Sequence, residues 1–266
     1  MDTGIKGRTA LIAGASRNMG RYAALALAAE GVNLAICTSS RMKELNEVAE
    51  AARKLGVRVL AEQCDITDNA SVEAFVKKAR GEFGGVDIAV NVAGYRAESP
   101  LLEIGVEEWN RNIAVNLTGP FHVCRNVIPL MKERRWGRII NLASVNGLQA
   151  TDMRLLKNLG YVATKHAMVG VTRQLAAEWG AHGITVNAIC PGLILTDSVT
   201  MGGPATAAAM GLSYDEMIER VFKSKTLTGE LNTVEQIAAV AVLLASDAGR
   251  GITGTFFNVD GGQSPY

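Results

Sequence analysis

Short apolar runs alternate along this chain with longer amphipathic stretches, and no other feature of the sequence restricts the fold as much. The runs typical of strands cover residues 8–13, 33–38, 57–63, 87–92, 137–143, 184–190 and 255–259. The stretches typical of helices cover residues 19–30, 41–55, 69–83, 107–134, 161–181 and 233–246. Strands that alternate with helices in this way form right-handed βαβ units. The pattern therefore predicts an α/β fold with a doubly wound, seven-stranded, mostly parallel sheet and helices on both faces.

Residues 196–229 break this rhythm. They are rich in small residues and methionine and follow the sixth predicted strand. A long insertion in a compact domain is either a lid or binding loop, or a disordered excursion. Its position favours a substrate lid at about 196–229. Since no repeat, low-complexity linker or charge run marks a boundary elsewhere, we expect residues 1–266 to form a single dinucleotide-binding catalytic domain.

The balance of charge indicates the kind of partner. The chain has 27 Lys and Arg against 26 Asp and Glu, a net charge of +1. This leaves no basic field for nucleic acid or an anionic membrane, so a small molecule is the expected partner. The four cysteines are scattered and the three histidines lack ligand-spaced partners, so no metal site is expected. The N-terminus does not resemble a signal peptide, and we expect a cytoplasmic protein.

Residues 13–20, Ala-Gly-Ala-Ser-Arg-Asn-Met-Gly, lie between the first predicted strand and helix. This turn holds phosphate in doubly wound sheets, because glycines admit the pyrophosphate and the helix N-terminus supplies amide donors. Gly14 and Gly20 suit that role. Asn18 stands where a glycine-rich turn has its middle glycine, and Asn tolerates a positive φ better than most residues. The alternative is a strand-to-helix turn that binds nothing.

Family-like motifs follow one another over essentially the whole chain. They are the loop with Gly14 and Gly20, Cys64-Asp65-Ile66, Asn91-Val92-Ala93-Gly94, Asn116, Ser144, Tyr161-Val162-Ala163-Thr164-Lys165, Pro191-Gly192 with Thr196, and Asn258-Val259-Asp260-Gly261-Gly262. In these motifs the chain resembles a classical short-chain dehydrogenase/reductase of the 3-oxoacyl-carrier-protein-reductase-like branch. The resemblance implies a Rossmann-type fold and hydride transfer between NAD(P)(H) and a carbonyl or secondary alcohol. It also implies a homotetramer, or a homodimer, built through the helices near 107–134 and 161–181 and the C-terminal end.

The resemblance also implies which residues bind the cofactor. Asp65 and Ile66 flank the adenine, Asn91 and Gly94 line the ribose and nicotinamide side, and Thr196 holds the carboxamide. The alternative for Asn91 is a purely structural hydrogen-bonding role. The alternative for Pro191 and Gly192 is a rigid turn that does not contact the cofactor. The full predicted set is Gly14, Ser16, Arg17, Asn18, Met19, Gly20, Thr38, Ser39, Arg41, Asp65, Ile66, Asn91, Ala93, Gly94, Tyr161, Lys165, Pro191, Gly192, Ile194 and Thr196. The chain departs from the family pattern at Ala13, which is expected to lower local rigidity, and at Asn18.

The end of the second predicted strand favours NADP(H). Sites that prefer NAD place a carboxylate there, which binds the ribose 2′-OH and repels a 2′-phosphate. Here that position is Thr38, followed by Ser39, Ser40 and Arg41. Arg17 and Arg41 could pair with a 2′-phosphate through charge-assisted hydrogen bonds. If both arginines are ordinary surface charges, NAD(H) becomes the alternative.

Tyr161 and Lys165 are the candidate proton-transfer pair. They are four residues apart on a predicted helix, so their side chains share one face, and an ammonium favours the phenolate form of its neighbour. Tyr161 would act as general acid or base, and Ser144 at a strand end would orient the substrate oxygen. By resemblance Asn116 holds a water that relays protons to Lys165 through a helix kink. The alternatives are a chance surface pair and a turn-starting serine.

The sequence indicates less about the substrate than about the cofactor. Ser144 and Tyr161 lie 17 residues apart, more than is usual in the family. Arg154 or Lys157 in this longer connection touches substrate or lid, unless both are solvated loop charges. Met201, Met210 and Tyr95 hint at an apolar or cyclic carbonyl, although methionines more often serve packing.

Two other functions stay open at this point. A nucleotide-binding sensor or scaffold with little or no turnover is motivated by Ala13 and Asn18. An epimerase or dehydratase would use a bound cofactor transiently. Net cofactor turnover separates the oxidoreductase from both.

Overall fold

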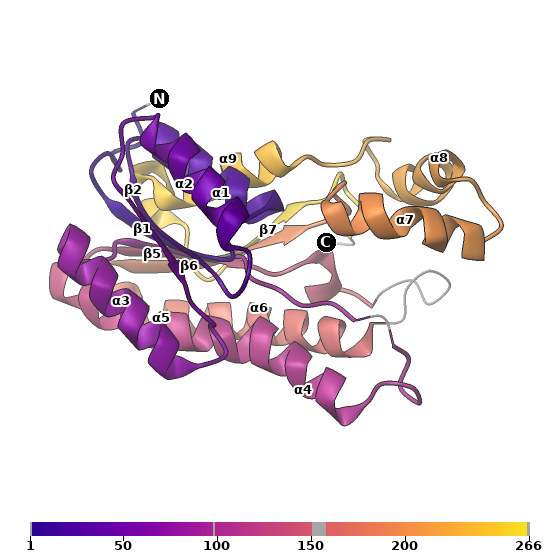
Figure 1. Ribbon diagram of the computed structural model, residues 1–266, viewed down its shortest axis with the longest axis horizontal. Helices are drawn as coiled ribbons and strands as arrows, with labels where there is room; N and C mark the ends of the chain where they lie inside the picture. Colours follow the sequence, from indigo (N-terminus) through magenta and orange to yellow (C-terminus); the bar gives the residue numbers. More distant parts are fainter. Residues whose placement is uncertain (1, 98, 151–157, 265–266) are drawn as a thin grey trace.

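The computed structural model describes residues 2–97, 99–150 and 158–264, and a sheet of seven parallel strands forms its centre (Figure 1). The strand order is β3-β2-β1-β4-β5-β6-β7, and every neighbouring pair is parallel. The strands are β1 (Thr9–Ala13), β2 (Asn33–Thr38), β3 (Val59–Gln63), β4 (Ile88–Asn91), β5 (Gly137–Leu142), β6 (Ile184–Pro191) and β7 (Phe256–Val259). The order reverses between β1 and β4, which makes this the switch point of a doubly wound sheet. The predicted fold class is confirmed.

Helices cover both faces of the sheet. One face carries α1 (Asn18–Ala29), α2 (Met42–Arg53) and α9 (Val234–Ala245), above the sheet in Figure 1. The other carries α3 (Asn69–Phe83), α5 (Gly119–Arg134) and α6 (Leu159–Trp179), below it. Among the helices that the structure describes, none is both long and apolar enough to cross a bilayer.

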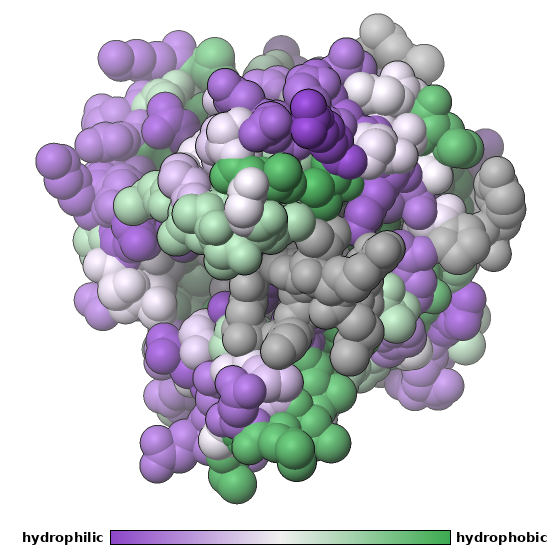
Figure 2. Space-filling view, turned by 90° about the vertical axis from the view of Figure 1, so that its right-hand side faces the viewer, coloured by the Kyte–Doolittle hydropathy of each residue, from purple (hydrophilic) through white to green (hydrophobic). Residues whose placement is uncertain are grey.

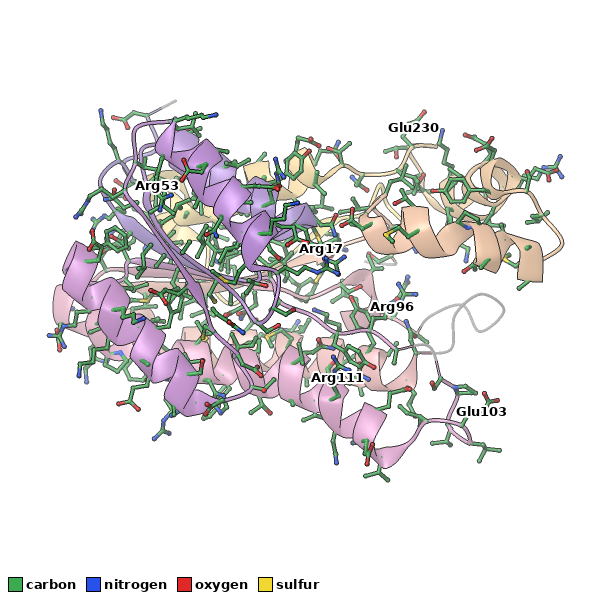
Figure 3. The ribbon with its side chains drawn as sticks, in the orientation of Figure 1. Arg17, Arg53, Arg96, Glu103, Arg111 and Glu230 are labelled. Atoms are coloured by element: carbon green, nitrogen blue, oxygen red, sulfur yellow. The ribbon has the colours of Figure 1, made fainter. Side chains whose placement is uncertain are left out.

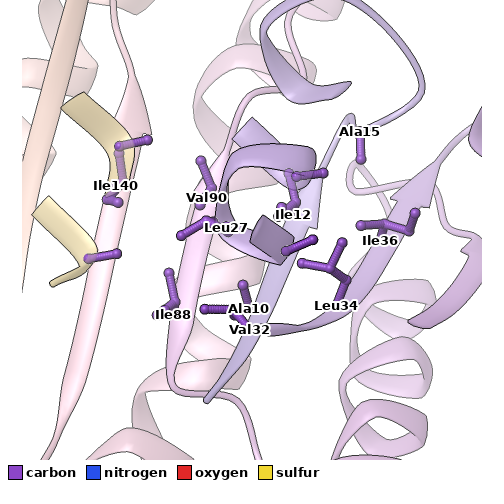
Figure 4. Close-up of a cluster of buried hydrophobic side chains, with 14 of the residues drawn as sticks. Ala10, Ile12, Ala15, Leu27, Val32, Leu34, Ile36, Ile88, Val90 and Ile140 are labelled. Atoms are coloured by element: carbon purple, nitrogen blue, oxygen red, sulfur yellow. The ribbon is translucent and has the colours of Figure 1, made fainter. Parts of the chain in front are cut away.

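Alternate residues of each strand enter opposite cores. In β1, Ala10 and Ile12 pack in the cluster under α1, α2 and α9, shown in Figure 4, while Leu11 and Ala13 pack in the cluster under α3, α5 and α6. All five residues of β1 are buried. Burial on both faces explains why the strands appear in the sequence as unbroken apolar runs. The two clusters fix the strand ends, and so the positions of the loops that follow them.

The predicted helix over 107–134 is divided by a π-helical turn. α4 (Val106–Ile113) leads into η1 (Ala114–Thr118) and then into α5. A π turn adds a residue per turn and is found mostly at functional sites. It places Asn116 on the side that faces α6. The π-helical turn thus contains Asn116, at the position where the resemblance implies a helix kink.

The predicted lid is helical. It consists of α7 (Asp197–Ala209), α8 (Tyr214–Glu216), η4 (Met217–Phe222) and η5 (Lys223–Lys225), and it projects from the end of the sheet in Figure 1. Ala207, Met217 and Ile218 form a small hydrophobic cluster of its own. The sequence analysis does not predict these helices, because Gly202-Gly203-Pro204 reads as a break. The Ala-rich residues 205–209 have high helix propensity and continue α7 past that point.

Candidate active site

A cavity of about 850 Å³ runs along the edge of the sheet at which the strands end. It begins at the β1–α1 loop, passes the ends of β2 and β3, and reaches Ser144, Tyr161 and the lid residues Phe222 and Lys225. In Figure 2, which shows this end of the molecule, hydrophobic residues gather in two groups on either side of the grey atoms. The exposed large hydrophobic side chains of the described residues include Leu101, Leu102, Val106 and Met201. All predicted cofactor residues line the cavity except Gly20 and Asn91.

The β1–α1 loop has the backbone of a phosphate-binding turn. Gly14 has φ +90°, and a Cβ there would lie 2.7 Å from the backbone nitrogen of Ala93. A Cβ at Gly20 would overlap the carbonyl oxygen of Gly14. Asn18 has φ +46°, in the left-handed region where glycine is otherwise favoured. Asn18 therefore takes the conformation that a glycine would take.

Asn18 and Arg17 also contact the lid. The side-chain oxygen of Asn18 accepts a hydrogen bond from the backbone N–H of Asp197 at 3.4 Å. The guanidinium of Arg17 lies 3.5 Å from the Asp197 carboxylate. Both side chains of this ion pair are about half exposed, so the pair itself contributes little stability. The β1–α1 loop and the first residue of α7 are nevertheless in direct contact.

The end of β2 carries hydroxyls and no acid. Thr38 is buried, and its hydroxyl lies 3.5 Å from that of Ser16 and accepts from the backbone N–H of Arg41. The guanidinium of Arg41 lies 3.1 Å from the carboxylate of Glu44. The residues predicted for a 2′-phosphate, Arg17, Thr38, Ser39 and Arg41, thus line the same cavity.

Two buried thiols lie between this end of β2 and the end of β3. A hydrogen bond from Cys37 lowers the pKa of the Cys64 thiol to about 7, and the same contact raises that of Cys37. Burial is the main cause that raises the pKa of the Cys124 thiol to about 12 and that of the Cys190 thiol to about 11. No group of His, Cys, Asp or Glu in the described ranges is arranged to hold a metal ion.

Asp65 and Ile66 line the predicted adenine side of the cavity. One carboxylate oxygen of Asp65 accepts from the backbone N–H of Thr67 at 2.9 Å and from its hydroxyl at 2.8 Å. These bonds fix the turn after β3 and orient the carboxylate. Ile66 is buried, and its carbonyl lies 2.9 Å from a ring nitrogen of His122.

Asn91 and Asn116 are buried and do not belong to the described cavity lining. The amide of Asn91 donates to the side-chain oxygen of Asn141 at 2.8 Å, which joins the ends of β4 and β5. The amide of Asn116 bonds both the N–H and the C=O of Tyr95 and donates to the Thr164 hydroxyl. Asn91 thus has the contacts of a structural residue, and Asn116 fastens the loop after β4 to α6.

Tyr161, Lys165 and Ser144 meet in the cavity. Lys165 is only 5% exposed, and its ammonium donates to the carbonyl of Leu142, the last residue of β5, at 2.6 Å. It lies 5.4 Å from the ring centre of Tyr161. A chance surface pair is excluded, because Lys165 is buried. The hydroxyl oxygen of Ser144 accepts from the backbone N–H of Asn146 at 3.1 Å, which leaves the hydroxyl proton to donate.

Pro191 and Gly192 end β6 at the same edge. The backbone N–H of Gly192 donates to the carbonyl of Val259 at 3.0 Å. A Cβ at Gly192 would lie 2.8 Å from the Cα of Asp260. The C-terminal motif therefore packs directly against the turn that precedes Ile194 and Thr196, and a glycine is needed for this close approach.

Several lining residues are absent from the sequence-based prediction. The most polar are Arg96, Arg111, Gln149, Lys225 and Gln263. Arg96 was detectable in principle, because it follows a predicted strand end by a few residues. Phe222 and Lys225 lie far along the chain in the lid and carry no local signal. Arg154 and Lys157 lie outside the described residues.

Comparisons with known proteins agree over nearly the whole length. A family model described as enoyl-(acyl carrier protein) reductase matches residues 14–264. The chain is 37% identical over 259 residues to a D-beta-hydroxybutyrate dehydrogenase of Cupriavidus necator, covering 97% of this chain and 98% of the relative. It is 35% identical over 270 residues to a D-threitol dehydrogenase of Mycolicibacterium smegmatis, covering 99% and 95%. It is 34% identical over 256 residues to a 3-oxoacyl-(acyl-carrier-protein) reductase of Staphylococcus epidermidis, covering 96% and 98%.

The fold comparison gives the same result. The crystal structure of a short-chain type dehydrogenase/reductase from Mycobacterium marinum superposes with a TM-score of 0.86 at 28% identity, covering 99% of this chain and 98% of that one. The sheet, the motifs and these matches lead to one conclusion. The chain belongs to the short-chain dehydrogenase/reductase family.

Proposed function

We propose that the chain is an NADP(H)-preferring oxidoreductase that interconverts a carbonyl and a secondary alcohol, with Tyr161 as the general acid and base. Membership of the family and the names of the relatives support oxidoreduction between CH–OH and C=O. The observation that carries the mechanism is the buried Lys165 ammonium beside Tyr161, in the same cavity as the phosphate loop.

The cavity fits a nicotinamide dinucleotide. At Gly14 and Gly20 the loop leaves no room for a side chain, as close approach of a pyrophosphate requires, and the N-terminus of α1 adjoins it. In the proposed arrangement the loop holds the pyrophosphate, Asp65 and Ile66 flank the adenine, and Thr196 holds the carboxamide. The bound cofactor supplies or accepts the hydride.

The chain's own residues manage the proton. The Lys165 ammonium, anchored to Leu142, stabilises negative charge on Tyr161 and so favours transfer of its proton to the substrate oxygen. Ser144 donates a hydrogen bond to that oxygen as charge develops there. Asn116 holds the loop after β4 in place, and its part in a proton relay stays a prediction.

The preference for NADP(H) rests on the end of β2. No acid follows that strand, and Arg17 and Arg41 both line the cavity. Each arginine has a carboxylate partner, Asp197 or Glu44, in an exposed pair. A 2′-phosphate carries more charge and more acceptor oxygens than a carboxylate, so it would displace these weak partners.

The test is net turnover. The purified chain is mixed with NADPH and a panel of ketones and oxo acids, and with NADP⁺ and the matching alcohols, while cofactor absorbance is followed. Tyr161→Phe is the control, which should bind cofactor and fail to turn over. Tight cofactor binding without net oxidation or reduction across the panel would instead support the sensor or scaffold.

Three further expectations stay predictions. They are the homotetramer, the single domain and the cytoplasmic location. Size-exclusion chromatography with light scattering tests the first of them directly.

A further inference from the structure

Two of the four thiols line the cavity, and the proposed proton-transfer mechanism uses neither. Cys37 lies in β2 and Cys64 follows β3, and both belong to the cavity lining. Cys124 in α5 and Cys190 in β6 do not belong to the described lining, although all four thiols are buried. Cys37 is 1% exposed and Cys64 is 3% exposed, so the cavity is the route by which a small reagent reaches them. The pair therefore differs from the other two thiols in access and not in burial.

The strand register brings these two thiols together. Cys37 is paired with Glu62 across β2 and β3, so Cys64, two residues further along, points to the same side of the sheet. The backbone N–H of Cys64 donates to the carbonyl of Thr38 at 2.9 Å, which continues the pairing past the end of β3. Both side chains belong to the hydrophobic cluster under α3, α5 and α6. They are hydrogen-bonded to each other, and this contact places each sulfur within reach of the other.

A third group favours the ionised form of Cys64. Ser71, in the first turn of α3, accepts a hydrogen bond from the backbone N–H of Asp65 at 3.2 Å and donates its hydroxyl proton to the Cys64 sulfur at 3.5 Å. The hydrogen bond from Cys37, and after it the one from Ser71, lowers the pKa of the Cys64 thiol to about 7, against burial and the carboxylates of Asp65 and Asp68. The thiolate is the reactive form of cysteine.

The backbone around the pair belongs to the proposed cofactor site. The carbonyl of Cys37 accepts hydrogen bonds from the N–H groups of Gly14 and Ala15 at 3.0 and 3.1 Å, which fixes the start of the β1–α1 loop. In Figure 3, Arg17 marks this loop at the end of the sheet that lies toward α7. Cys64 directly precedes the residues predicted to flank the adenine. Movement of either cysteine therefore reaches the loop or the adenine side of the cavity.

We propose that Cys64 is a modification site at which hydrogen peroxide forms a disulfide with Cys37, and that this disulfide and the cofactor exclude each other. The thiolate of Cys64 attacks one peroxide oxygen, the O–O bond breaks, and a sulfenic acid forms while the leaving hydroxide takes up a proton as water. The sulfur of Cys37 then attacks that of Cys64, the S–O bond breaks, and a second water leaves with the proton of Cys37. The thiols lose two electrons and the peroxide gains them. The position beside the adenine rests on the proposed function, whereas the thiol chemistry does not.

The first experiment maps the bond in the wild-type chain. The reduced protein is exposed to hydrogen peroxide, quenched with catalase, alkylated with N-ethylmaleimide in denaturant and digested with trypsin for mass spectrometry. The expected product joins the peptides 22–41 and 59–77, which contain Cys37 and Cys64, while Cys124 and Cys190 are recovered alkylated. Treatment with dithiothreitol before alkylation should abolish the cross-link. Recovery of Cys37 and Cys64 as alkylated thiols after peroxide, or equal oxidation of all four thiols, would overturn the proposal.

Variants separate the roles of the residues. Cys37→Ala should leave Cys64 as a sulfenic acid that dimedone labels, and Cys64→Ala should leave Cys37 reduced. Ser71→Ala should slow formation of the disulfide several-fold at pH 7, because the donor to the Cys64 sulfur is lost. Cys190→Ala is the matched control, since Cys190 is buried away from the described cavity lining, and should react at the wild-type rate. Oxidation of Cys37 in Cys64→Ala would contradict the role of Cys64 as the residue that peroxide attacks.

The last experiment tests the exclusion between disulfide and cofactor. NADP⁺ at about ten times its Kd should slow the oxidation about 10-fold by mass action, because the adenine closes the route to the thiols. The oxidised protein should bind NADPH at least about 10-fold more weakly in a fluorescence titration, since charge-assisted bonds in the β1–α1 loop are disturbed, and dithiothreitol should restore the affinity. An unchanged rate with NADP⁺ bound, or an unchanged affinity after oxidation, would overturn the exclusion. A disulfide in a protein that binds neither cofactor would retain the modification site and remove the proposed function.

Discussion

The two ends of the cavity are built in different ways. The proposed cofactor end is formed by backbone at the ends of β1, β2 and β3, and its glycines and turns lie within a few residues of a strand. The proposed substrate end is formed by a loop, by α4 and by residues of the predicted lid such as Phe222 and Lys225, which are distant in the sequence. Sheet topology fixes the first end, whereas the packing of an insertion fixes the second. Local motifs can therefore identify a cofactor site and leave a substrate site undetermined.

Ser144→Ala should have the largest effect, and it should affect catalysis without affecting cofactor binding. Removing the hydrogen bond to the substrate oxygen is expected to lower kcat by about 100-fold to 1,000-fold. Ser144 lies at the end of β5, away from the phosphate loop, so the Kd for NADPH should change little. Stopped-flow kinetics and a fluorescence titration measure the two quantities. A comparable loss of cofactor affinity would show that the two ends are not independent.

Gly14→Ala should damage the cofactor end and the fold together. The new methyl group would press on the backbone of Ala93 at a φ of +90°, and steric pressure with strain of this kind costs about 1–3 kcal/mol. Thermal unfolding and NADPH titration provide the measurements. Gly56→Ala is the matched control, because Gly56 also has a positive φ but open space around it. Equal effects in both variants would assign the whole cost to φ and contradict the close approach.

Arg17→Ala and Arg41→Ala test whether the proposed cofactor end prefers NADPH to NADH. Each substitution is expected to weaken NADPH binding about 10-fold, since a charge-assisted hydrogen bond to the 2′-phosphate is lost. The affinity for NADH should stay nearly unchanged. Asp197→Asn removes the carboxylate that pairs with Arg17 and should strengthen NADPH binding slightly. Fluorescence titrations with NADPH and with NADH measure the two affinities. An equal loss of affinity for NADH would show that the arginines do not discriminate between the two cofactors.

Asn18 offers the smallest and most local test. Asn18→Gly keeps the left-handed backbone and removes only the contact with Asp197, so the Kd for NADPH should stay within about threefold. Asn18→Ala adds a strain of about 1–2 kcal/mol and should bind NADPH several-fold more weakly. If Asn18→Gly is as damaged as Asn18→Ala, the contact with the lid matters more than the backbone conformation.

The same contrast explains what the sequence could predict. Burial on both faces made the strands continuous apolar runs, so the sheet and the positions of Ser144, Tyr161 and Lys165 followed from pattern and resemblance. The left-handed φ of Asn18 agrees with the tolerance of Asn for a positive φ. The burial of Lys165 was not predicted, because it depends on the end of β5 lying against α6.

The predicted lid shows why the other features of the site could not be predicted from the sequence. Its helices pack on a hydrophobic cluster of their own around Met217, and a pattern interrupted by Gly203 and Pro204 hides them in the sequence. Arg96 and Lys225 come together only once the loop after β4 and the lid have folded over the same cavity. Long-range packing of this kind leaves no periodic trace in a single sequence.

The most direct test of the account is the path of the hydride. NADPH carrying deuterium on the transferable position of its nicotinamide is incubated with the protein and the carbonyl compound that the panel identifies, and the product is examined by mass spectrometry. The account predicts an alcohol with deuterium on the former carbonyl carbon, one for each NADPH oxidised, and none with Tyr161→Phe. Cofactor that binds tightly while no compound is reduced, or a product without deuterium, would contradict it.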